Sequence, residues 1–457
     1  PPLTVSPTAS FSASTTPGPT GSPMASSSSP PTPGPMTGGG GSTEGGRSYS
    51  QAPKVVASEG SYMDHFGFSV SGITGFSFLV GAAYSDNDQG TDIGSAYVFT
   101  SDSGIDWVQA NKIVASDGAF QDYFGCSVSN MTGNSFVVGA AYDDDDLRGS
   151  STDAEWAGSA YIFKSDSGSW VQAGKVVASD VSIMHTFGSA VSGMGSSGSF
   201  VVGGAFDVPY DDHYVHAVYV FTSGDADAGS WIQADRVGIS DGPSSFSGFG
   251  KAVSGMMTET SFVAGAVWAG CHDGQDYCSG AAYVFTSDSG NWVQAGQVVA
   301  TDGSSLDNFD SLYQLWWAVL LFVVGAYQDD DQGENSGSAY VFSRSDAGSW
   351  VQTEKVVASD ASYMENFGFS VSSMTSDSFA VGAYYSWYSW GDRSGSVYVF
   401  TNDAGSWVQV GKVVPSDGSY HDYFGSSVSG MGGRSSFLVG APFDDVDEDG
   451  QGSVYFF

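Results

Sequence analysis

Short blocks of hydrophobic residues follow one another along most of the chain and are separated by polar turns. The recurring blocks read FGxSV, SFVVGA, GSAYVF and WVQAGKVV, with clusters of Gly, Ser and Asp between them. Blocks of this length that are rich in Val, Phe, Tyr and Trp predict β-strands. No window holds an apolar period of 3.6 residues long enough to predict a helix. The pattern therefore predicts an all-β protein.

The order of these four blocks repeats seven times. A Phe-Gly pair marks six of the units, and Phe309-Asp310 marks the remaining one. The marker residues lie 58, 63, 62, 60, 58 and 57 positions apart, at Phe66, Phe124, Phe187, Phe249, Phe309, Phe367 and Phe424. A fixed period of this kind is the sequence signature of a repeat architecture.

Four strands in each of seven units predict a seven-bladed β-propeller of four-stranded blades. In Ala96–Phe99 both alternating sets of residues are apolar, so both faces of the strand need the cover that stacked blades provide. The seventh unit stops after its third strand, whereas residues 49–54 (YSQAPK) align with 170–175 (WVQAGK), the fourth strand of another unit. We therefore expect an N-terminal strand at about 49–57 to complete the last blade, which would leave no long unpaired edge.

Residues 1–46 have a different composition, rich in Ser, Thr, Pro and Gly. Such a segment cannot bury a core and predicts an extended arm or stalk, with an inert linker as the alternative. We divide the chain into this arm and a propeller of residues 47–457. The chain does not begin with Met and has no recognisable signal peptide, so we expect a processed or partial chain.

The recurring FG and GA motifs, with one literal Gly440-Ala441-Pro442, resemble the FG-GAP repeats of the integrin α-subunit propeller and its microbial relatives. The resemblance covers about residues 48–457. It implies adhesion, ligand binding or extracellular assembly, but it does not choose among them. The calcium residues of that family do not carry over, because the turns between first and second strands, such as SGITG and SNMTG, lack carboxylate clusters.

Composition agrees with a location outside the cell. The chain holds 13 Lys and Arg against 50 Asp and Glu, a net charge of −37. This charge argues against nucleic acid or an anionic membrane surface as a partner. No apolar run reaches the roughly 18 residues of a membrane-spanning helix. Cys271 and Cys278 share one loop and predict a local disulfide in an oxidising compartment, with two free thiols as the alternative.

Carboxylates gather between the second and third strands of several units. Asp445, Asp447 and Asp449 with Gly450 match the opening of a D-x-D-x-D-G calcium loop, although Phe456 stands where the closing Glu is expected. A solvated acidic loop is the alternative to calcium. Strand alternation places these loops on the same face as the ASDGxxxDxFG connections, and we expect that face to be strongly acidic.

Two loops depart from the repeat and predict interfaces, because exposed apolar residues at a blade end mark contact sites. The residues are Leu315, Trp316 and Trp317 in the fifth unit and Trp387, Tyr388 and Trp390 in the sixth. A sequence error across Leu312–Leu321 is the alternative for the first loop, and local packing for the second. Asn130 begins the only N-glycosylation sequon, in the turn after FGCSVS, where a glycan would lie in solvent.

Catalytic signals are absent from the sequence. No nucleophile elbow, phosphate-binding loop or zinc spacing occurs, and the six histidines are scattered, so we do not expect an enzyme. Two function classes remain. The first is an extracellular structural glycoprotein that self-associates through arm and propeller in a filament or matrix. The second is a lectin-like or adhesion-receptor propeller that binds other extracellular proteins or glycans.

Overall fold

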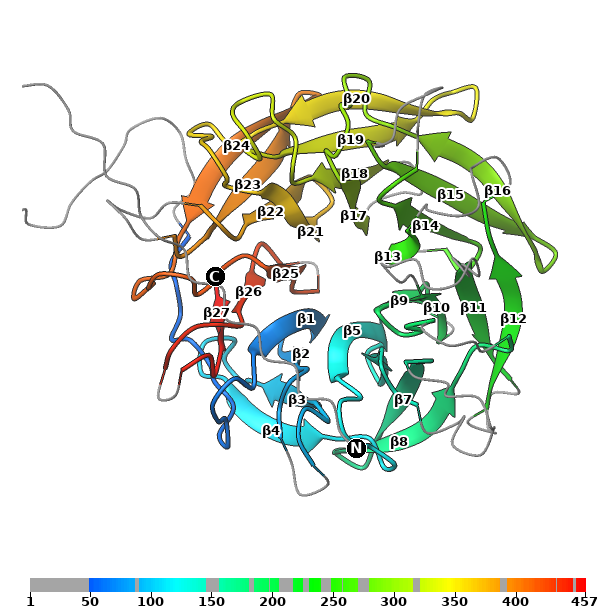
Figure 1. Ribbon diagram of the computed structural model, residues 1–457, viewed down its shortest axis with the longest axis vertical. Coiled ribbons are helices and arrows are strands. Elements are labelled where there is room, and N and C mark those ends of the chain that lie inside the picture. The colour runs from blue at the N-terminus through cyan, green and yellow to red at the C-terminus, as the bar shows by residue number, and fades with distance from the viewer. Residues whose placement is uncertain are drawn as a thin grey trace, which may run out of the picture. The chain divides into compact units, whose positions relative to one another are not determined.

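A computed structural model describes residues 49–86, 90–144, 156–180, 185–196, 198–204, 217–224, 230–239, 248–256, 258–269, 279–314, 321–386, 393–432, 434–446 and 449–457. Figure 1 shows seven antiparallel sheets arranged as blades around a central axis, with β1, β5, β9, β13, β17, β21 and β25 innermost. Within each blade the strands follow chain order from the axis outward. The predicted seven-bladed, all-β propeller is confirmed.

The first four blades have four strands each. Blade 1 holds β1 (Phe66–Thr74), β2 (Ser77–Ala82), β3 (Ser95–Thr100) and β4 (Val108–Ile113). Blade 2 holds β5 (Phe124–Thr132), β6 (Ser135–Ala140), β7 (Ser159–Asp166) and β8 (Ser169–Val176). Blade 3 holds β9 (Ala190–Met194), β10 (Ser199–Gly204), β11 (Ala217–Ser223) and β12 (Trp231–Val237). Blade 4 holds β13 (Phe249–Gly255), β14 (Ser261–Ala266), β15 (Ala281–Asp288) and β16 (Asn291–Val298).

The last three blades complete the ring. Blade 5 holds β17 (Phe309–Gln314), β18 (Leu321–Ala326), β19 (Ser338–Arg344) and β20 (Trp350–Val356). Blade 6 holds β21 (Phe367–Thr375), β22 (Ser378–Ala383), β23 (Ser396–Asp403) and β24 (Ser406–Val413). Blade 7 has three strands, β25 (Ser427–Gly430), β26 (Phe437–Ala441) and β27 (Ser453–Phe456).

The hydrophobic core lies between neighbouring blades and not inside single sheets. Between blades 1 and 7, for example, Phe66, Phe78 and Phe99 pack with Leu438 and Val454. Equivalent clusters fill the other junctions, and each centres on the Phe, Val and Tyr residues of the inner three strands. Both faces of the inner strands are therefore covered by neighbouring blades, as the apolar pattern predicts.

The glycines of the two recurring motifs let adjacent blades approach closely. Gly125 of the Phe-Gly pair has φ +94°. A Cβ added to Gly81 would lie only 2.0 Å from the Gly125 carbonyl oxygen. The same relation joins Gly440 in blade 7 to Gly67 in blade 1. A side chain at either position would collide with the backbone of the next blade.

The N-terminal segment lies along β27, but it is not the regular strand that we expected. Val55 forms a single antiparallel bridge with Val454, and the Ala52 N–H donates to the Phe456 carbonyl at 2.9 Å. Pro53, between these contacts, has no N–H to donate, so the ladder is interrupted there. The seventh sheet consequently keeps three regular strands and a bridged segment.

Side chains of this segment nevertheless make the contacts that outer strands make elsewhere. A glutamine on the outer strand of one blade accepts the backbone N–H that follows the outer strand of the preceding blade. The pairs, at 2.9–3.0 Å, are Gln109–Ser58, Gln172–Ser116, Gln233–Ser179, Gln352–Thr301, Gln409–Ser359 and Gln51–Ser416. Gln51 thus links the start of the chain to blade 6.

Candidate interaction surface

The propeller has two ends with different chemistry. We call one end the connection face: it carries the loops between second and third strands and the connections between blades. The two sets are hydrogen-bonded, for example from the Met63 N–H to the Asp449 carbonyl at 3.0 Å and from Met364 to Glu334 at 2.8 Å. This agrees with their expected placement on one face. The opposite end, which we call the turn face, carries the short turns between first and second strands.

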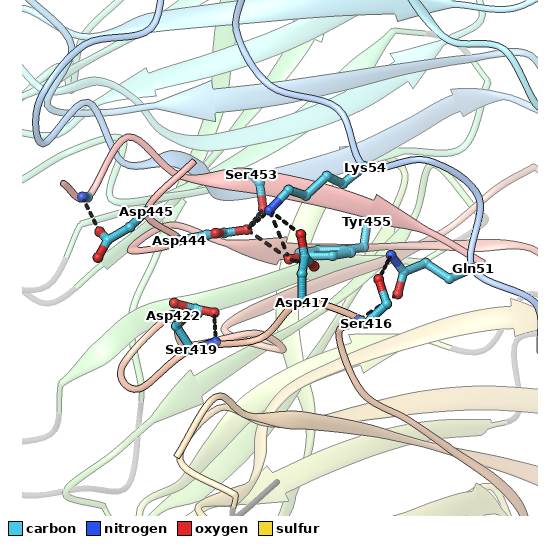
Figure 2. A network of polar contacts seen from close by, with 11 residues as sticks. Gln51, Lys54, Ser416, Asp417, Ser419, Asp422, Asp444, Asp445, Ser453 and Tyr455 are labelled. Carbon is cyan, nitrogen blue, oxygen red and sulfur yellow. Dashed lines mark hydrogen bonds and ion pairs between the residues drawn. The ribbon is translucent and has the colours of Figure 1, made fainter. Parts of the chain in front are cut away.

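A partly buried ion-pair network on the connection face joins blade 7 to blade 6 (Figure 2). The Lys54 ammonium lies 2.9 Å from Asp444 and 2.7 Å from Asp417. The Tyr455 hydroxyl lies within hydrogen-bonding distance of both carboxylates, 2.8 Å from Asp444 and 2.9 Å from Asp417, and can donate its one proton to either. Burial lowers the pKa of Lys54, but its hydrogen bonds to Asp417 and Asp444 outweigh this and leave the pKa raised. The lysine therefore stays charged.

The network recurs around the ring. In blade 2, Lys175 lies 2.9 Å from both Asp117 and Asp143, and the Tyr161 hydroxyl donates to Asp143 at 2.6 Å. Lys355, Lys412 and Arg236 occupy the same place in blades 5, 6 and 3, opposite Asp302, Asp360 and Asp180. Five of the 13 Lys and Arg residues of this acidic chain thus lie where neighbouring blades meet.

A second set of carboxyl groups is buried in the connections that lead into the first strands. Asp422 and Asp307 each accept the backbone N–H of the residue three positions earlier, Ser419 and Ser304. Burial raises the pKa of Asp422 to about 7, and the charges of Asp444 and Asp445 add to the rise. Burial likewise raises the pKa of Asp307 to about 6. These groups therefore titrate well above an ordinary aspartate.

Exposed aromatic side chains recur at one repeat position on the connection face. Tyr62, Phe120, Tyr363 and Tyr420 each stand two residues before the buried acid of their connection, with 57, 63, 47 and 55% of the side chain exposed. Scattered apolar residues on a surface are ordinary, but large ones repeated on one face mark a contact surface. None of these rings is needed to fill the core between blades.

Half-buried rings, together with the buried His65, form a continuous arc on the same face. Neighbouring ring centroids are 4.2–5.5 Å apart, in the order Trp156, Tyr142, Tyr123, Tyr84, His65, Phe443, Tyr423, Tyr384, Phe369 and Tyr327. Tyr420 is connected to the arc through His421, whose ring centroid lies 3.6 Å from that of Tyr420 and 5.5 Å from that of Tyr423. Exposed carboxylates such as Asp86, Asp330 and Asp445 flank it. The face combines aromatic rings with negative charge.

The proposed calcium loop is only partly within the described residues. Asp445 accepts the Gly450 N–H at 2.7 Å, Asp449 is exposed, and Asp447 lies outside the described residues. The nearby charge of Asp445 raises the pKa of Asp449. Two carboxylates offer fewer oxygen ligands than calcium takes. Within the described ranges, no group of three or more His, Cys, Asp or Glu is placed to hold a metal ion.

Asn130, the sequon residue, lies within β5 and not in the turn where we expected it. The pairing of β5 with β6 extends beyond Asn130: Asn130 pairs with Phe136, and Thr132 pairs with Ser135. Its side chain lines a cavity of about 400 Å³ at the turn face, with serines and glycines of the inner strands around it. The amide nitrogen that a glycan would occupy donates to the Ile73 carbonyl at 3.5 Å.

Leu315, Trp316, Trp317, Trp387, Tyr388, Trp390, Cys271 and Cys278 lie outside the described residues. Sequence reasoning missed the lysine–aspartate network and the exposed aromatic set. Both had a signal: a Lys recurs in the WVQAGK block, and an aromatic residue recurs before the acid of the connection.

The fold and this face define a β-propeller with an interaction surface, a class that mediates protein–protein or ligand contacts. Comparison with protein families matches the FG-GAP repeat over residues 49–99, 107–163, 318–342, 350–400 and 407–457, slightly more than half of the chain. The chain belongs to the FG-GAP repeat family, whose repeats are typical of extracellular proteins. No curated protein matched the sequence. No helix in the described part of the chain is long and apolar enough to cross a membrane.

Proposed function

We propose that this propeller is an extracellular structural protein that assembles with other copies of itself through its connection face. The observation that carries the proposal is the recurrence of exposed aromatic rings at the same position, in Tyr62, Phe120, Tyr363 and Tyr420. Aromatic residues are enriched in protein interfaces because they bury a large area while losing little side-chain entropy. Family membership supports the same class of role.

A binding role is also proposed in preference to an enzymatic one. His65 and His185 are buried, and burial lowers the pKa of His65 to about 4. His65 packs against Tyr84 and Phe443 with ring centroids 4.6 and 4.2 Å away. A histidine held neutral among rings acts as a packing residue and is poorly suited to transfer protons near neutral pH.

A second candidate function rests on the cavity at the turn face. Its volume of about 400 Å³ falls in the range of small-ligand sites. Ser71, Ser129 and Ser192 are among the residues that line it, and each of their hydroxyl groups accepts a backbone N–H from the next blade. A neutral polar ligand such as a sugar would suit this lining. The candidate would make the protein a ligand-binding propeller, with Asn130 among the contact residues.

The assembly proposal is tested on the full chain by sedimentation velocity and negative-stain imaging. We define a face variant, Tyr62→Ser, Phe120→Ser, Tyr363→Ser and Tyr420→Ser. As the matched control we define a rim variant on the outer strands, Val108→Thr, Val171→Thr, Ile232→Thr and Val293→Thr, whose side chains are 65, 44, 61 and 54% exposed.

We expect concentration-dependent oligomers from the natural chain and the rim variant, and monomers from the face variant. Monomers from the natural chain at all concentrations would refute self-assembly. Oligomers that survive in the face variant would move the interface away from the connection face. Binding of a labelled sugar to natural monomers, lost in Asn130→Ala, would favour the second candidate.

A further inference from the structure

The proposed assembly face must accept a partner surface in spite of its negative charge. Exposed carboxylates, among them Asp86, Asp330 and Asp445, flank the aromatic rings, and the chain as a whole carries −37. Two connection faces, or a connection face and the rim of a second propeller, would bring like charges together at a cost. The occupant should therefore be neutral or basic.

One segment of this chain is free of charge. Residues 1–43 contain no Asp, Glu, Lys, Arg or His, whereas the propeller holds nearly all of the acidic residues. The same region holds 10 of the 15 prolines of the chain. Proline-rich segments favour the polyproline II conformation, and grooves lined by aromatic rings bind that conformation at a low entropic cost. The absence of charge and the high proline content therefore both point to residues 1–43 as the occupant of the face.

The position at which this segment joins the propeller bears on which copy it can reach. The Tyr49 ring packs on Phe437 with centroids 5.7 Å apart. Phe437 begins β26, directly after the turn that links it to β25, so the described chain starts at the turn face. The exposed aromatic rings lie at the opposite end of the propeller. A segment leaving one end is suited to a receptor on the opposite end of a second copy.

We propose that the aromatic connection face binds the uncharged, proline-rich residues 1–43 of a second copy. This inference rests on the proposed assembly function. The prolines lie over Tyr62, Phe120, Tyr363 and Tyr420, and the half-buried arc forms the floor. Each copy offers one arm and one face, which is a heterologous contact and builds an open head-to-tail filament when the rotation does not close. At about 3.1 Å per residue, 43 residues in this conformation span up to roughly 130 Å.

The decisive experiment mixes two full-length variants. The arm variant has all ten prolines of residues 1–46 replaced by Ser and keeps the face. The face variant, defined above, keeps the arm. Each alone is expected to remain monomeric, and an equimolar mixture should form a complex of one face variant with one arm variant. Sedimentation equilibrium measures the stoichiometry, and the rim variant should behave as the natural chain does.

Each alternative has its own outcome. If the arm variant alone still oligomerises while the face variant does not, the connection face binds something other than the arm, and this inference fails while the proposed function stands. If the face variant alone oligomerises like the natural chain, the proposed function itself fails. If the natural chain is monomeric, both proposals are overturned. A complex in the mixture would then mean that each arm binds its own propeller in the natural chain, and no complex would mean that the arm has no receptor.

A direct measurement uses a labelled synthetic peptide of residues 1–43 and the arm variant as receptor. Fluorescence anisotropy should give saturable binding, weakened at least about tenfold when the four face substitutions are added to the arm variant. Because the peptide is uncharged, its affinity should depend little on salt. Equal affinity for both proteins would overturn the inference. Affinity for a lysine-rich peptide alone, lost in high salt, would assign the face to a basic partner.

Discussion

At the scale of single residues, the two motif glycines are required because neighbouring blades touch there through their backbones. Gly81 and Gly125 meet across the junction of blades 1 and 2, and Gly440 and Gly67 do so where the ring closes. Gly125 also needs its left-handed φ of +94°, whereas Gly81 has no such need. At Gly81 the constraint is contact alone.

This constraint predicts that Gly81→Ala destabilises the propeller. The added methyl group would lie 2.0 Å from the Gly125 carbonyl oxygen, so the blades must separate, and overpacking of this kind costs about 1–3 kcal/mol or more. Gly133→Ala is the matched control, since nothing lies within 4 Å of its added Cβ. Denaturant unfolding of both variants measures the difference. A loss of stability in Gly133→Ala equal to that in Gly81→Ala would disprove the contact argument.

At the scale of elements, the segment before β1 adds polar contacts between blade 7 and both of its neighbours. Gln51 binds Ser416 of the blade 6 connection, Lys54 binds Asp417 and Asp444, and the Ser58 N–H donates to Gln109 of blade 1. A short segment with one β-bridge therefore replaces a full outer strand by side-chain contacts.

We predict that deletion of residues 47–58 lowers the thermal midpoint sharply. Blade 7 would keep three strands, and Asp444, whose side chain is 5% exposed, would lose its counter-charge. Lys54→Met isolates the second effect, and because the pair is only partly buried we expect it to cost less than the about 3–5 kcal/mol of a fully buried pair. Differential scanning calorimetry measures both variants. Deletion of twelve residues from the arm, 20–31, serves as control and should leave the midpoint unchanged; a deletion of 47–58 that melts like the natural chain would refute closure by this segment.

At the scale of the whole molecule, acidic groups with opposite pKa shifts are distributed around the ring. Burial raises the folded pKa of Asp422 to about 7 and of Asp307 to about 6, and also raises that of Asp64 and Glu365. By contrast, Asp417 has a lowered pKa because its bond to Lys54 outweighs its own burial. The first kind takes up protons on folding, and the second kind releases them.

The propeller should therefore be most stable in weak acid, near pH 5. His65 opposes this, because its lowered pKa of about 4 costs stability as pH falls below 6.5, but the raised acids are more numerous. Groups with a raised folded pKa stabilise the fold at low pH, and this contribution is lost as pH rises from about 4 to about 7. Groups such as Asp417 act below that window, where stability falls as they become protonated. Thermal midpoints measured from pH 3 to pH 8 check this.

The Asp422→Asn variant tests the assignment of this pH dependence. Asparagine keeps an acceptor for the Ser419 N–H but carries no charge. We expect a higher midpoint than the natural chain at pH 8 and a smaller gain on acidification to pH 5. Asp417→Asn should instead lower the midpoint at pH 8, since it removes a partner of Lys54. A natural midpoint that is flat or falls from pH 8 to pH 5 would contradict the argument.

The sequence by itself determined the number of blades, their strand order and the chemistry of the strands. The information is local: each repeat of about 60 residues carries its own four apolar blocks, and Ala96–Phe99 reveals by composition alone that both faces are covered. The alignment of residues 49–54 with an outer strand likewise located the contact with β27. Local patterning did not reveal that Pro53 reduces this strand to a bridge, because that depends on which N–H groups the ladder uses.

Only the tertiary structure decided which charged and aromatic residues meet. Asp444 reads in the sequence as one member of a solvated acidic loop, yet it is buried against Lys54, 390 positions away in the chain. Tyr62 and Tyr420 likewise stand far apart in sequence and share a face only because the ring brings every connection to one end. Pairing across the ring closure and exposure on one face are properties of the closed propeller, and a repeat read by itself does not contain them.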